Sequence, residues 1–192
     1  MIKRLFDLFF SLIGVIILSP LLLVLAILIK TSSPGPVFYR GIRAGKNGKN
    51  FKIFKFRTMV VNAEKMSGPS TALDDPRLTR IGKFLRKWKL DELPQLFNVI
   101  KGDMSLVGPR AYYPDELREQ QKKYPTTRDS VKVVLSVKPG LTGYWQVSGR
   151  SEINFDKRIE MDAQYVRKRS ILYDLWIILK TPWAMISGKG AL

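Results

Sequence analysis

Residues 5–29 read LFDLFFSLIGVIILSPLLLVLAILI, a stretch that is almost wholly apolar. At 1.5 Å per residue, a straight helix of this length would reach roughly 37 Å, more than the ~30 Å hydrocarbon core of a bilayer. Length alone therefore predicts a helix that crosses a membrane. A cleaved signal peptide fits poorly, because the apolar region is too long and no small-x-small cleavage pattern follows it.

Two residues near the middle of this stretch argue against a simple span. Pro20 has no N–H, and its ring clashes with the carbonyl of Ile16, four residues earlier. Ser19 beside it can return a side-chain hydrogen bond to the carbonyl of Val15. The sequence therefore predicts a kink near the centre of the helix.

Basic residues flank both ends of the apolar stretch, with Lys3 and Arg4 before it and Lys30, Arg40 and Arg43 after it. The positive-inside rule then assigns both ends to the cytoplasmic side. A kinked helix that enters and leaves the same leaflet satisfies both observations. An ordinary membrane-spanning helix with a tolerated proline is the alternative that these residues leave open.

The composition bounds the size and the partners of the protein. The 192 residues are 45% hydrophobic, which suits one domain plus a membrane element and excludes a large multidomain machine. Lys and Arg number 33 against 16 Asp and Glu, for a formal net charge of +17. Such a charge favours a polyanionic partner, which can be a nucleic acid, an acidic lipid or a phosphorylated substrate.

Cysteine and histidine are both absent from the chain. The absence of cysteine excludes disulfides and a thiolate nucleophile, and the absence of histidine removes the usual general base and the commonest zinc ligand. Any catalysis must therefore use carboxylates, Lys, Arg, Tyr or hydroxyl groups.

A mainly helical α+β fold is expected after the apolar stretch. Residues 51–59, FKIFKFRTM, alternate apolar and basic side chains, which predicts a strand that pairs with residues 37–39 in a hairpin. The same alternation resembles a nucleic-acid stacking surface, but a half-buried strand with a solvated basic face is the simpler reading. Helices are predicted at residues 77–90, 94–100, 114–123 and 171–186, a surface loop at 62–75, and a strand or buried segment at 131–137.

Two of these helices have an amphipathic character that suits a membrane surface. The helix at 77–90 carries apolar residues at helical spacing between Lys and Arg residues, so it can lie against core or lipid. The segment 171–186 contains Trp176 and Trp183 and is interrupted by Pro182. It is too short to span, and it predicts either an interfacial helix or a packed core helix.

The segment 90–110, LDELPQLFNVIKGDMSLVGPR, places two adjacent carboxylates at a predicted helix start. Asp91 and Glu92 precede Pro94, which is tolerated in the first turn of a helix, where the dipole favours anions. Asp91 is therefore expected to stay ionised. Such a carboxylate can bind Mg²⁺ or attack phosphorus to form an acyl phosphate. The simpler alternative is a helix cap.

Arginines in the same part of the sequence favour phosphate chemistry. Arg86 lies five residues before Asp91, Arg110 follows a Gly-Pro pair, and Arg150 ends the Gly-containing segment LTGYWQVSGR. Guanidinium groups bind phosphate oxygens bidentately and stabilise charge that develops in phosphoryl transfer. With a divalent cation they can hold a diphosphate, and surface ion pairs are the alternative for each of them.

In order along the chain, several motifs resemble those of the bacterial sugar transferases, the small monotopic phosphoglycosyl transferases that make polyprenyl-diphosphate sugars. The matching stretches are LFDLFFSLIGVIILSPLLL, FKIFKFRTM, LTRIGKFLRKWKLDELPQLFNVIKGDMSLVGPR, VKPGLTGYWQVSGR, MDAQYV and DLWIILKT. They cover almost the whole chain.

The resemblance implies a fold and a mechanism. It implies a reentrant helix broken at Ser19 and Pro20 over residues 1–30, followed by a cytoplasmic membrane-associated catalytic domain over 31–192. Asp91 would attack the β-phosphate of a UDP-sugar and release UMP, and a polyprenyl phosphate, with undecaprenyl phosphate expected, would accept the phosphosugar. Glu92 would assist proton movement or order the site, and Mg²⁺ would lie against Asp91 and the diphosphate.

The resemblance also maps further site residues onto this chain. The basic and loop positions of the family fall on Lys55, Arg57, Arg86, Arg110 and Arg150, and its late acidic positions fall on Asp162 and Asp174. Many relatives read Pro-Arg-Pro after GDMS, whereas this chain reads Pro109-Arg110-Ala111, which can loosen that loop.

The implied location is the cytoplasmic face of the bacterial plasma membrane, in the minimal form of the family without a further N-terminal membrane domain. Anionic phospholipids are expected partners, nucleic acid is not, and a homodimer is left open. Apart from the resemblance, the residues leave two other functions open. They are a membrane-anchored nucleic-acid-binding protein, which leaves the Asp91-Glu92 pair unexplained, and a noncatalytic basic scaffold at the membrane surface.

Overall fold

The computed structural model describes residues 1–66, 74–148 and 153–186, which form a mainly helical α+β structure with small sheets. The α-helices are α1 (Ile2–Ser32), α2 (Ala63–Met66), α3 (Arg80–Lys87), α4 (Gln95–Lys101), α5 (Pro114–Lys123), α6 (Arg128–Leu135), α7 (Tyr144–Ser148), α8 (Phe155–Lys168) and α9 (Ile171–Ile186). Short 3₁₀ turns are η1 (Lys46–Gly48), η2 (Leu90–Glu92) and η3 (Pro125–Thr127). The strands are β1 (Phe38–Tyr39), β2 (Ile42–Ala44), β3 (Asn50–Lys52), β4 (Lys55–Phe56), β5 (Ser105–Val107) and β6 (Gly140–Thr142).

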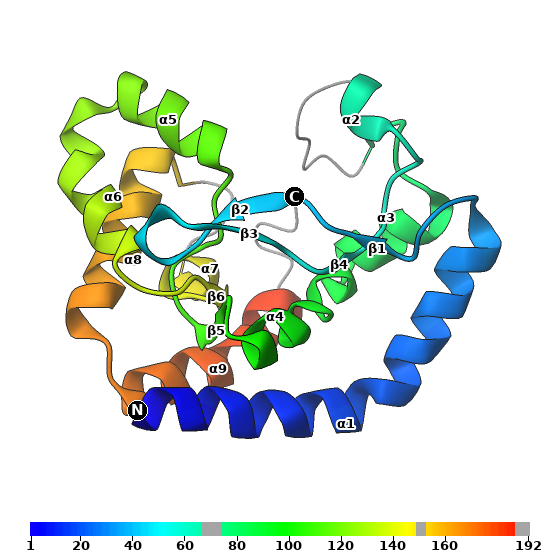
Figure 1. Ribbon diagram of the computed structural model, residues 1–192, viewed down its shortest axis with the longest axis horizontal. Coiled ribbons are helices and arrows are strands. Elements are labelled where there is room, and N and C mark those ends of the chain that lie inside the picture. The colour runs from blue at the N-terminus through cyan, green and yellow to red at the C-terminus, as the bar shows by residue number, and fades with distance from the viewer. Residues whose placement is uncertain (67–73, 149–152, 187–192) are drawn as a thin grey trace.

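Helix α1 is long, apolar and bent. Its first half runs along one edge of the molecule, and its second half turns up beside α3, so that the rest of the chain lies on the inner side of the bend (Figure 1). An 18-residue window of the helix has a mean hydropathy of 3.1, and only 11% of that window is buried. By length and composition α1 can therefore reach across a membrane.

The chemistry at Pro20 explains how the helix tolerates its proline. Pro20 cannot donate a hydrogen bond to the carbonyl of Ile16, and the hydroxyl of Ser19 donates to that same carbonyl at 2.8 Å. The predicted acceptor, the carbonyl of Val15, was wrong by one residue. Ser19 thus satisfies the carbonyl that Pro20 leaves without its helical partner.

Polar groups dock the first half of α1 onto the rest of the chain. The Asp7 side chain is buried, and its two oxygens accept hydrogen bonds from Ser105 Oγ at 2.8 Å and from the backbone N–H of Leu106 at 3.1 Å. Arg4 donates to the carbonyls of Val99 and Ile100 at 2.5 and 2.7 Å. It thereby satisfies carbonyls at the C-terminal end of α4, where the helix dipole favours a cation.

The second half of α1 is held mainly by apolar packing. Leu22, Leu25 and Ile29 form a buried cluster with Phe56 of β4 and Leu85 of α3. Burial of each such side chain contributes about 1.5–3 kcal/mol relative to exposure. This half of the helix therefore shares one core with the segments that lead to Asp91.

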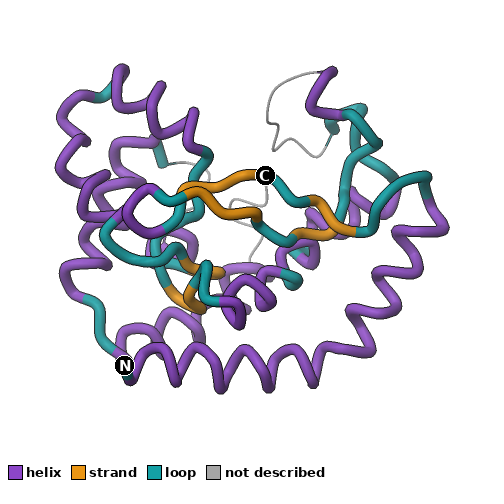
Figure 2. Tube along the Cα trace, viewed as in Figure 1, coloured by secondary structure: helices purple, strands orange, loops and turns teal. Residues whose placement is uncertain are grey.

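The predicted hairpin is confirmed, although it is split into two short ladders. Antiparallel pairing joins β1 to β4, with Tyr39 opposite Lys55, and joins β2 to β3 nearer the turn. The turn contains Asn47 at φ 57°, a conformation that asparagine tolerates better than most residues. The strands cross the centre of the molecule between the helices (Figure 2).

A parallel pair of strands, β5 and β6, forms the base from which the Arg110 loop departs. The two backbones approach so closely that a Cβ on Gly140 would lie 2.1 Å from the backbone nitrogen of Gly108. Glycine is therefore required where these strands meet.

For the segment 131–137 the structure rejects one of the two predicted alternatives, the strand, and supports the other, a buried segment. The β-branched run predicted a strand or buried segment, but most of it lies in helix α6. Val131 and Val134 are buried there against Ile159 of α8 and Tyr112 in one hydrophobic cluster. The spacing of three residues between the valines suits one face of a helix, and packing outweighs the weak β propensity of valine.

The Asp7 contacts predict a specific stability effect. Asp7→Ala is expected to destabilise the docking of α1 by about 1–3 kcal/mol, because it leaves the Ser105 hydroxyl and the Leu106 N–H buried without an acceptor. Thermal unfolding in detergent or nanodiscs measures this as a lower Tm. Phe9→Ala, on the same half of α1 but at a side chain that is 60% exposed, is the matched control and should change Tm little. Equal Tm values for Asp7→Ala and the wild type would contradict the assignment.

Candidate active site

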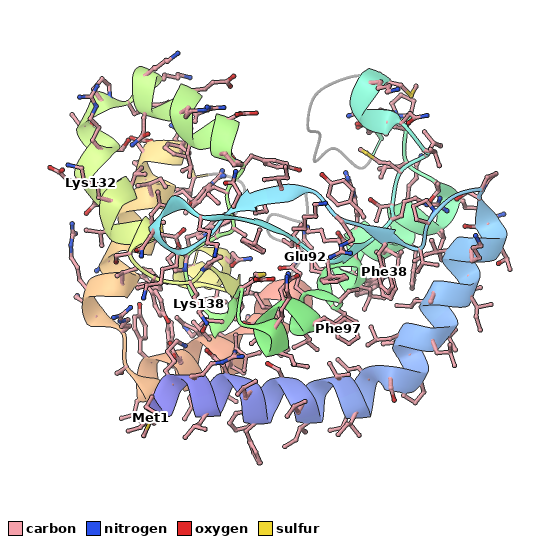
Figure 3. The ribbon with its side chains drawn as sticks, in the orientation of Figure 1. Met1, Phe38, Glu92, Phe97, Lys132 and Lys138 are labelled. Atoms are coloured by element: carbon pink, nitrogen blue, oxygen red, sulfur yellow. The ribbon has the colours of Figure 1, made fainter. Side chains whose placement is uncertain are left out.

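Asp91 and Glu92 lie in η2, immediately before α4, as the sequence predicts for a helix start. Lys89 precedes them in the left-handed conformation at φ 55° and turns the chain sharply after α3. The Asp91 residue is 6% exposed, whereas the Glu92 side chain is 26% exposed. Glu92 lies near the centre of the molecule, far from Met1 and Lys132 at its edges (Figure 3).

Lys55 of β4 contacts both carboxylates. Its Nζ lies 2.6 Å from Glu92 Oε1 and 3.7 Å from Asp91 Oδ2. The second oxygen, Asp91 Oδ1, is buried and has no hydrogen-bond partner within the described ranges. Glu92 is therefore the closer partner of Lys55, and Asp91 keeps one oxygen without a hydrogen bond from the described residues.

Burial and the nearby cations shift the pKa values of the two carboxylates in opposite directions. Burial raises the pKa of Asp91 above its usual value, and Lys55 only partly opposes this. This direction is opposite to the one expected from a helix N-terminus alone. Burial acts on Glu92 too, but the charge and hydrogen bond of Lys55, with help from Lys89 and Arg110, lower its pKa to about 2. Glu92 is thus the stronger acid of the pair.

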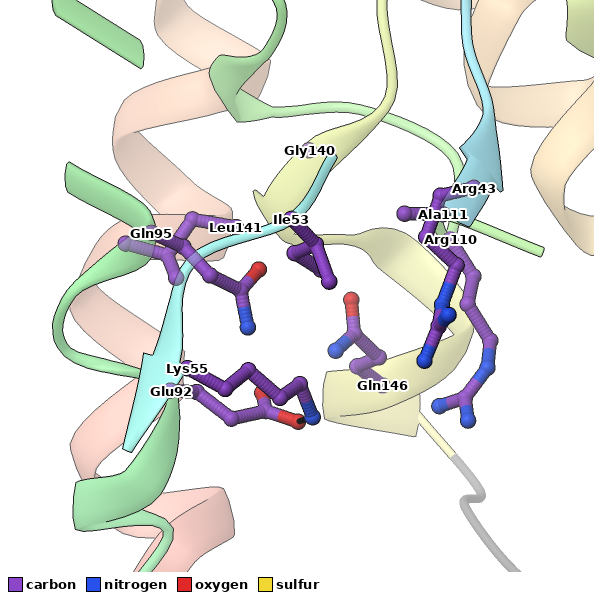
Figure 4. Close-up of a pocket in the computed structure, with 10 residues that line it drawn as sticks. All are labelled: Arg43, Ile53, Lys55, Glu92, Gln95, Arg110, Ala111, Gly140, Leu141 and Gln146. Carbon is purple, nitrogen blue, oxygen red and sulfur yellow. Dashed lines mark hydrogen bonds and ion pairs between the residues drawn. The ribbon is translucent and has the colours of Figure 1, made fainter. Parts of the chain in front are cut away.

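Beside Lys55 and Glu92 lies a polar pocket with cationic groups on two sides. Lys55, Glu92 and Gln95 line one side, and Arg43 and Arg110 line the other (Figure 4). Its remaining lining residues are Ile53, Ala111, Gly140, Leu141 and Gln146. Such a pocket suits an anionic ligand with more than one phosphate, because cations lie at both of its sides.

The buried carboxylate of Asp162 holds the loop that carries Arg110. Asp162 Oδ2 accepts hydrogen bonds from the Arg110 backbone N–H and from the Tyr112 hydroxyl, each at 3.0 Å. Burial raises the pKa of Asp162 to about 7, although these two hydrogen bonds act to lower it. The guanidinium of Arg110 lies 5.5 Å from the ring centre of Trp145. Asp162 therefore positions Arg110 and does not itself line the pocket.

The other predicted phosphate-binding residues occupy different places. Arg86 Nε donates to Thr58 Oγ1 at 3.1 Å, and its charge acts on Asp91. The Arg57 guanidinium binds the carbonyls of Ser33 and Pro34 at 2.8 and 2.5 Å, just after the end of α1. Arg57 therefore satisfies the C-terminal end of α1 and does not line the pocket.

Asp174 and Arg150 complete the set of predicted site residues. Asp174 is buried and accepts hydrogen bonds from Lys3 and from the Tyr165 hydroxyl, both at 2.6 Å, so it links α9 to the start of α1. Arg150 lies outside the described residues.

Several residues of the site were missed by sequence reasoning. Arg43 and the two glutamines Gln95 and Gln146 line the pocket. Asn98 does not line it but binds the backbone on both sides of the lining residue Ile53. The Asn98 side chain accepts from the Phe54 N–H at 2.7 Å and donates to the Lys52 carbonyl at 2.9 Å. The available sequence signal was the polar Asn98 among the apolar residues of α4. A polar group at such a position, if buried, needs hydrogen-bond partners elsewhere in the fold.

Asp91 offers one ligand for a divalent cation. The free Oδ1 of Asp91 fits a single carboxylate ligand for Mg²⁺. Within residues 1–66, 74–148 and 153–186 no group of three or more Asp, Glu, His or Cys could form a complete metal site. Mg²⁺ here would therefore need phosphate oxygens and water as further ligands, which is its usual mode in phosphoryl transfer sites.

Comparison with known proteins places these features in a family. The model of the family described as bacterial sugar transferase matches residues 1–188. The undecaprenyl-phosphate galactose phosphotransferase of Salmonella typhimurium is 42% identical, over 99% of this chain and 41% of that protein. The exopolysaccharide production protein ExoY of Sinorhizobium fredii is 40% identical, over 98% of this chain and 87% of ExoY.

A third relative carries a more specific name. The UDP-glucose:undecaprenyl-phosphate glucose-1-phosphate transferase of Escherichia coli is 36% identical, over 100% of this chain and 41% of that protein. The chain thus spans about two fifths of the length of the Salmonella and Escherichia proteins and most of the length of ExoY. With a family match over almost its whole length, and with the predicted carboxylate pair and basic pocket in one place, this chain belongs to the bacterial sugar transferase family.

Proposed function

We propose that this protein transfers a sugar-1-phosphate from a UDP-sugar to a polyprenyl phosphate, in a first membrane step of bacterial polysaccharide or glycan assembly. Undecaprenyl phosphate is the expected acceptor, in keeping with the names of the relatives from Salmonella and Escherichia. The observation that carries the proposal is the buried Asp91 carboxylate. Its Oδ1 has no hydrogen-bond partner among the described residues, and its Oδ2 lies 3.7 Å from Lys55, which lines the pocket with Arg43 and Arg110.

The reaction proceeds in two displacements at one phosphorus. An Asp91 oxygen attacks the β-phosphorus of the UDP-sugar and forms an acyl-phosphate bond. The bond from that phosphorus to the bridging oxygen breaks, and the bridging oxygen leaves with UMP. A phosphate oxygen of the polyprenyl phosphate then attacks the same phosphorus, the acyl-phosphate bond breaks, and Asp91 is released as a carboxylate.

Lys55 supports both steps electrostatically. Its ammonium group favours the ionised form of Asp91, which is the nucleophilic form, and it can stabilise negative charge on the transferred phosphoryl group. Glu92 keeps a negative charge because its pKa is low, and its 2.6 Å contact holds Lys55 beside Asp91. Glu92 therefore acts as a positioning residue for Lys55.

Arg110 and Arg43 suit the nucleotide side of the diphosphate. They line the side of the pocket opposite Lys55, so a diphosphate that reaches Asp91 would extend toward them (Figure 4). Asp91 would hold Mg²⁺ through its free carboxylate oxygen, and a bound Mg²⁺ would supply neutralisation of diphosphate charge.

The membrane location completes the proposal. We propose that α1 is reentrant, with its bend inside the cytoplasmic leaflet and both ends at the cytoplasmic surface. The bend, the Ser19 contact at Pro20 and the basic residues at both ends support this topology. In α9, Leu172, Leu179 and Trp183 are each more than three quarters exposed, which supports a helix that lies in the interface with anionic phospholipids.

The first prediction concerns the nucleophile. Asp91→Asn is expected to lower Mg²⁺-dependent UMP release from a UDP-sugar by at least about 10³-fold, because an amide cannot form the acyl phosphate. The measurement uses protein in nanodiscs with undecaprenyl phosphate and a panel of UDP-sugars. Asp129→Asn, at a side chain that is 88% exposed on α6, is the matched control and should keep wild-type turnover. Turnover by Asp91→Asn near the wild-type rate would exclude Asp91 as the nucleophile.

The second prediction concerns pH. The Asp91 pKa is raised by burial and partly held down by Lys55, so activity should fall as pH decreases through that pKa. Lys55→Gln removes the opposing charge and should move the acidic limb of the kcat/KM profile to higher pH. A pH profile for the wild type and the variant measures this shift. A variant that loses rate equally at every pH would show that Lys55 does not set the ionisation of the nucleophile.

The third prediction concerns topology, and the absence of cysteine makes it simple to test. In the reentrant arrangement, Ile2→Cys and Lys30→Cys should both resist a membrane-impermeant maleimide outside intact spheroplasts and both react in inverted vesicles. Lys132→Cys, at a 78% exposed side chain on α6, is the reference position that shows on which side of the membrane the chain after α1 lies. Labelling of the two α1 positions from opposite sides would establish a spanning helix.

A further inference from the structure

Gln95 is a polar side chain of the pocket that forms no hydrogen bond with the described residues. Gln95, in the first turn of α4, is only 3% exposed, yet its amide forms no hydrogen bond there. The amide faces the pocket, beside Lys55 and Glu92 and across from the amide of Gln146 (Figure 4). The little surface that Gln95 exposes therefore lies at the pocket, where its amide is free to hydrogen-bond a ligand.

The chemistry of an amide identifies the kind of group that it would bind. The other polar groups that line the pocket near Gln95 are the charged Lys55 and Glu92, which already pair with each other at 2.6 Å. Gln95 adds a neutral group with two donors and one acceptor. This combination matches adjacent hydroxyls, which both donate and accept, better than it matches phosphate oxygens, which only accept.

The arrangement of charges places a neutral group at this side of the pocket. If the β-phosphate lies at Asp91 and Lys55, the rest of the nucleotide extends toward Arg43 and Arg110 on the opposite side. The sugar is the other substituent of the β-phosphate, so it remains on the side of Lys55. Gln95 is the uncharged polar side chain on that side.

We infer that Gln95 binds hydroxyl groups of the transferred sugar and thereby contributes to the choice of sugar, with Gln146 forming the facing wall. This inference rests on the proposed function, because it assumes a UDP-sugar with its β-phosphate at Asp91. A neutral bidentate group of this kind distinguishes epimers, since moving one hydroxyl leaves a buried donor or acceptor unpaired.

The test separates sugar contacts from nucleotide contacts. Gln95→Leu keeps the approximate size of the side chain and removes its hydrogen bonds, and Gln95→Glu keeps its shape and changes its charge. For each variant in nanodiscs, kcat/KM is measured for UDP-glucose, UDP-galactose and UDP-N-acetylglucosamine. The inhibition constant of UMP, which lacks the sugar, is measured beside it. Gln121→Leu on α5, outside the residues that line the pocket, is the matched control.

The expected result is selective. Gln95→Leu should lower kcat/KM for the preferred donor by about tenfold to a hundredfold. It should also change the ratio between the preferred sugar and its epimer, and leave the UMP inhibition constant within about twofold. Gln121→Leu should match the wild type in all three measurements.

Other results would overturn the inference in distinguishable ways. Weaker UMP inhibition in step with the loss of kcat/KM would assign Gln95 to the nucleotide or its phosphate. An unchanged donor ratio with wild-type kinetics would show that Gln95 touches no part of the donor. If the Tm shows that Gln95→Leu does not fold, the uncharged and unbranched Gln95→Met provides the same comparison. Failure of the wild type to release UMP from any UDP-sugar would instead reject the proposed function itself.

Discussion

The packing of α1 against the rest of the chain is the constraint on which the structure depends. An apolar helix that exposes most of its surface can be held in one orientation only where polar groups or close packing fix it. Asp7 and Arg4 supply the polar fixings for the first half, through β5 and the end of α4. Leu25 and Ile29 supply the apolar packing for the second half. Both β5 and α4 adjoin the candidate active site, so the long apolar helix and the site form one unit.

The same elements set the relative positions of the charged groups in the candidate site. Asp91 lies before α4, and Lys55 lies on β4, 36 positions earlier in the sequence. Asn98 joins the two elements by bonding to the backbone on either side of Ile53. On the opposite side of the pocket, Asp162 accepts a hydrogen bond from the backbone N–H of Arg110 and so positions that residue. Buried polar side chains therefore place the charged ones, and they do so through hydrogen bonds to backbone groups that sequence spacing does not reveal.

Local patterns predicted the elements well where one physical signal dominated. The apolar run, the proline at its centre, the period-two hairpin strand and the helix start at Asp91 all follow from short-range rules, and the structure contains each of them. For the segment 131–137 the strand alternative was wrong, because β-branching and helical spacing gave opposite signals. Packing against α8 decided between them, and this partner is distant in the sequence.

The sequence by itself determined the chemistry that is available, because a chain without cysteine or histidine must rely on groups such as carboxylates and cations, and Asp91 with Glu92 is one of its adjacent carboxylate pairs. Tertiary structure decided which cations meet that pair. Lys55 and Arg110 reach the pocket, whereas Arg57 binds the end of α1 and Asp174 binds Lys3. The physical reason is that a charged side chain takes the nearest complementary partner in three dimensions, and that partner is set by how the chain folds.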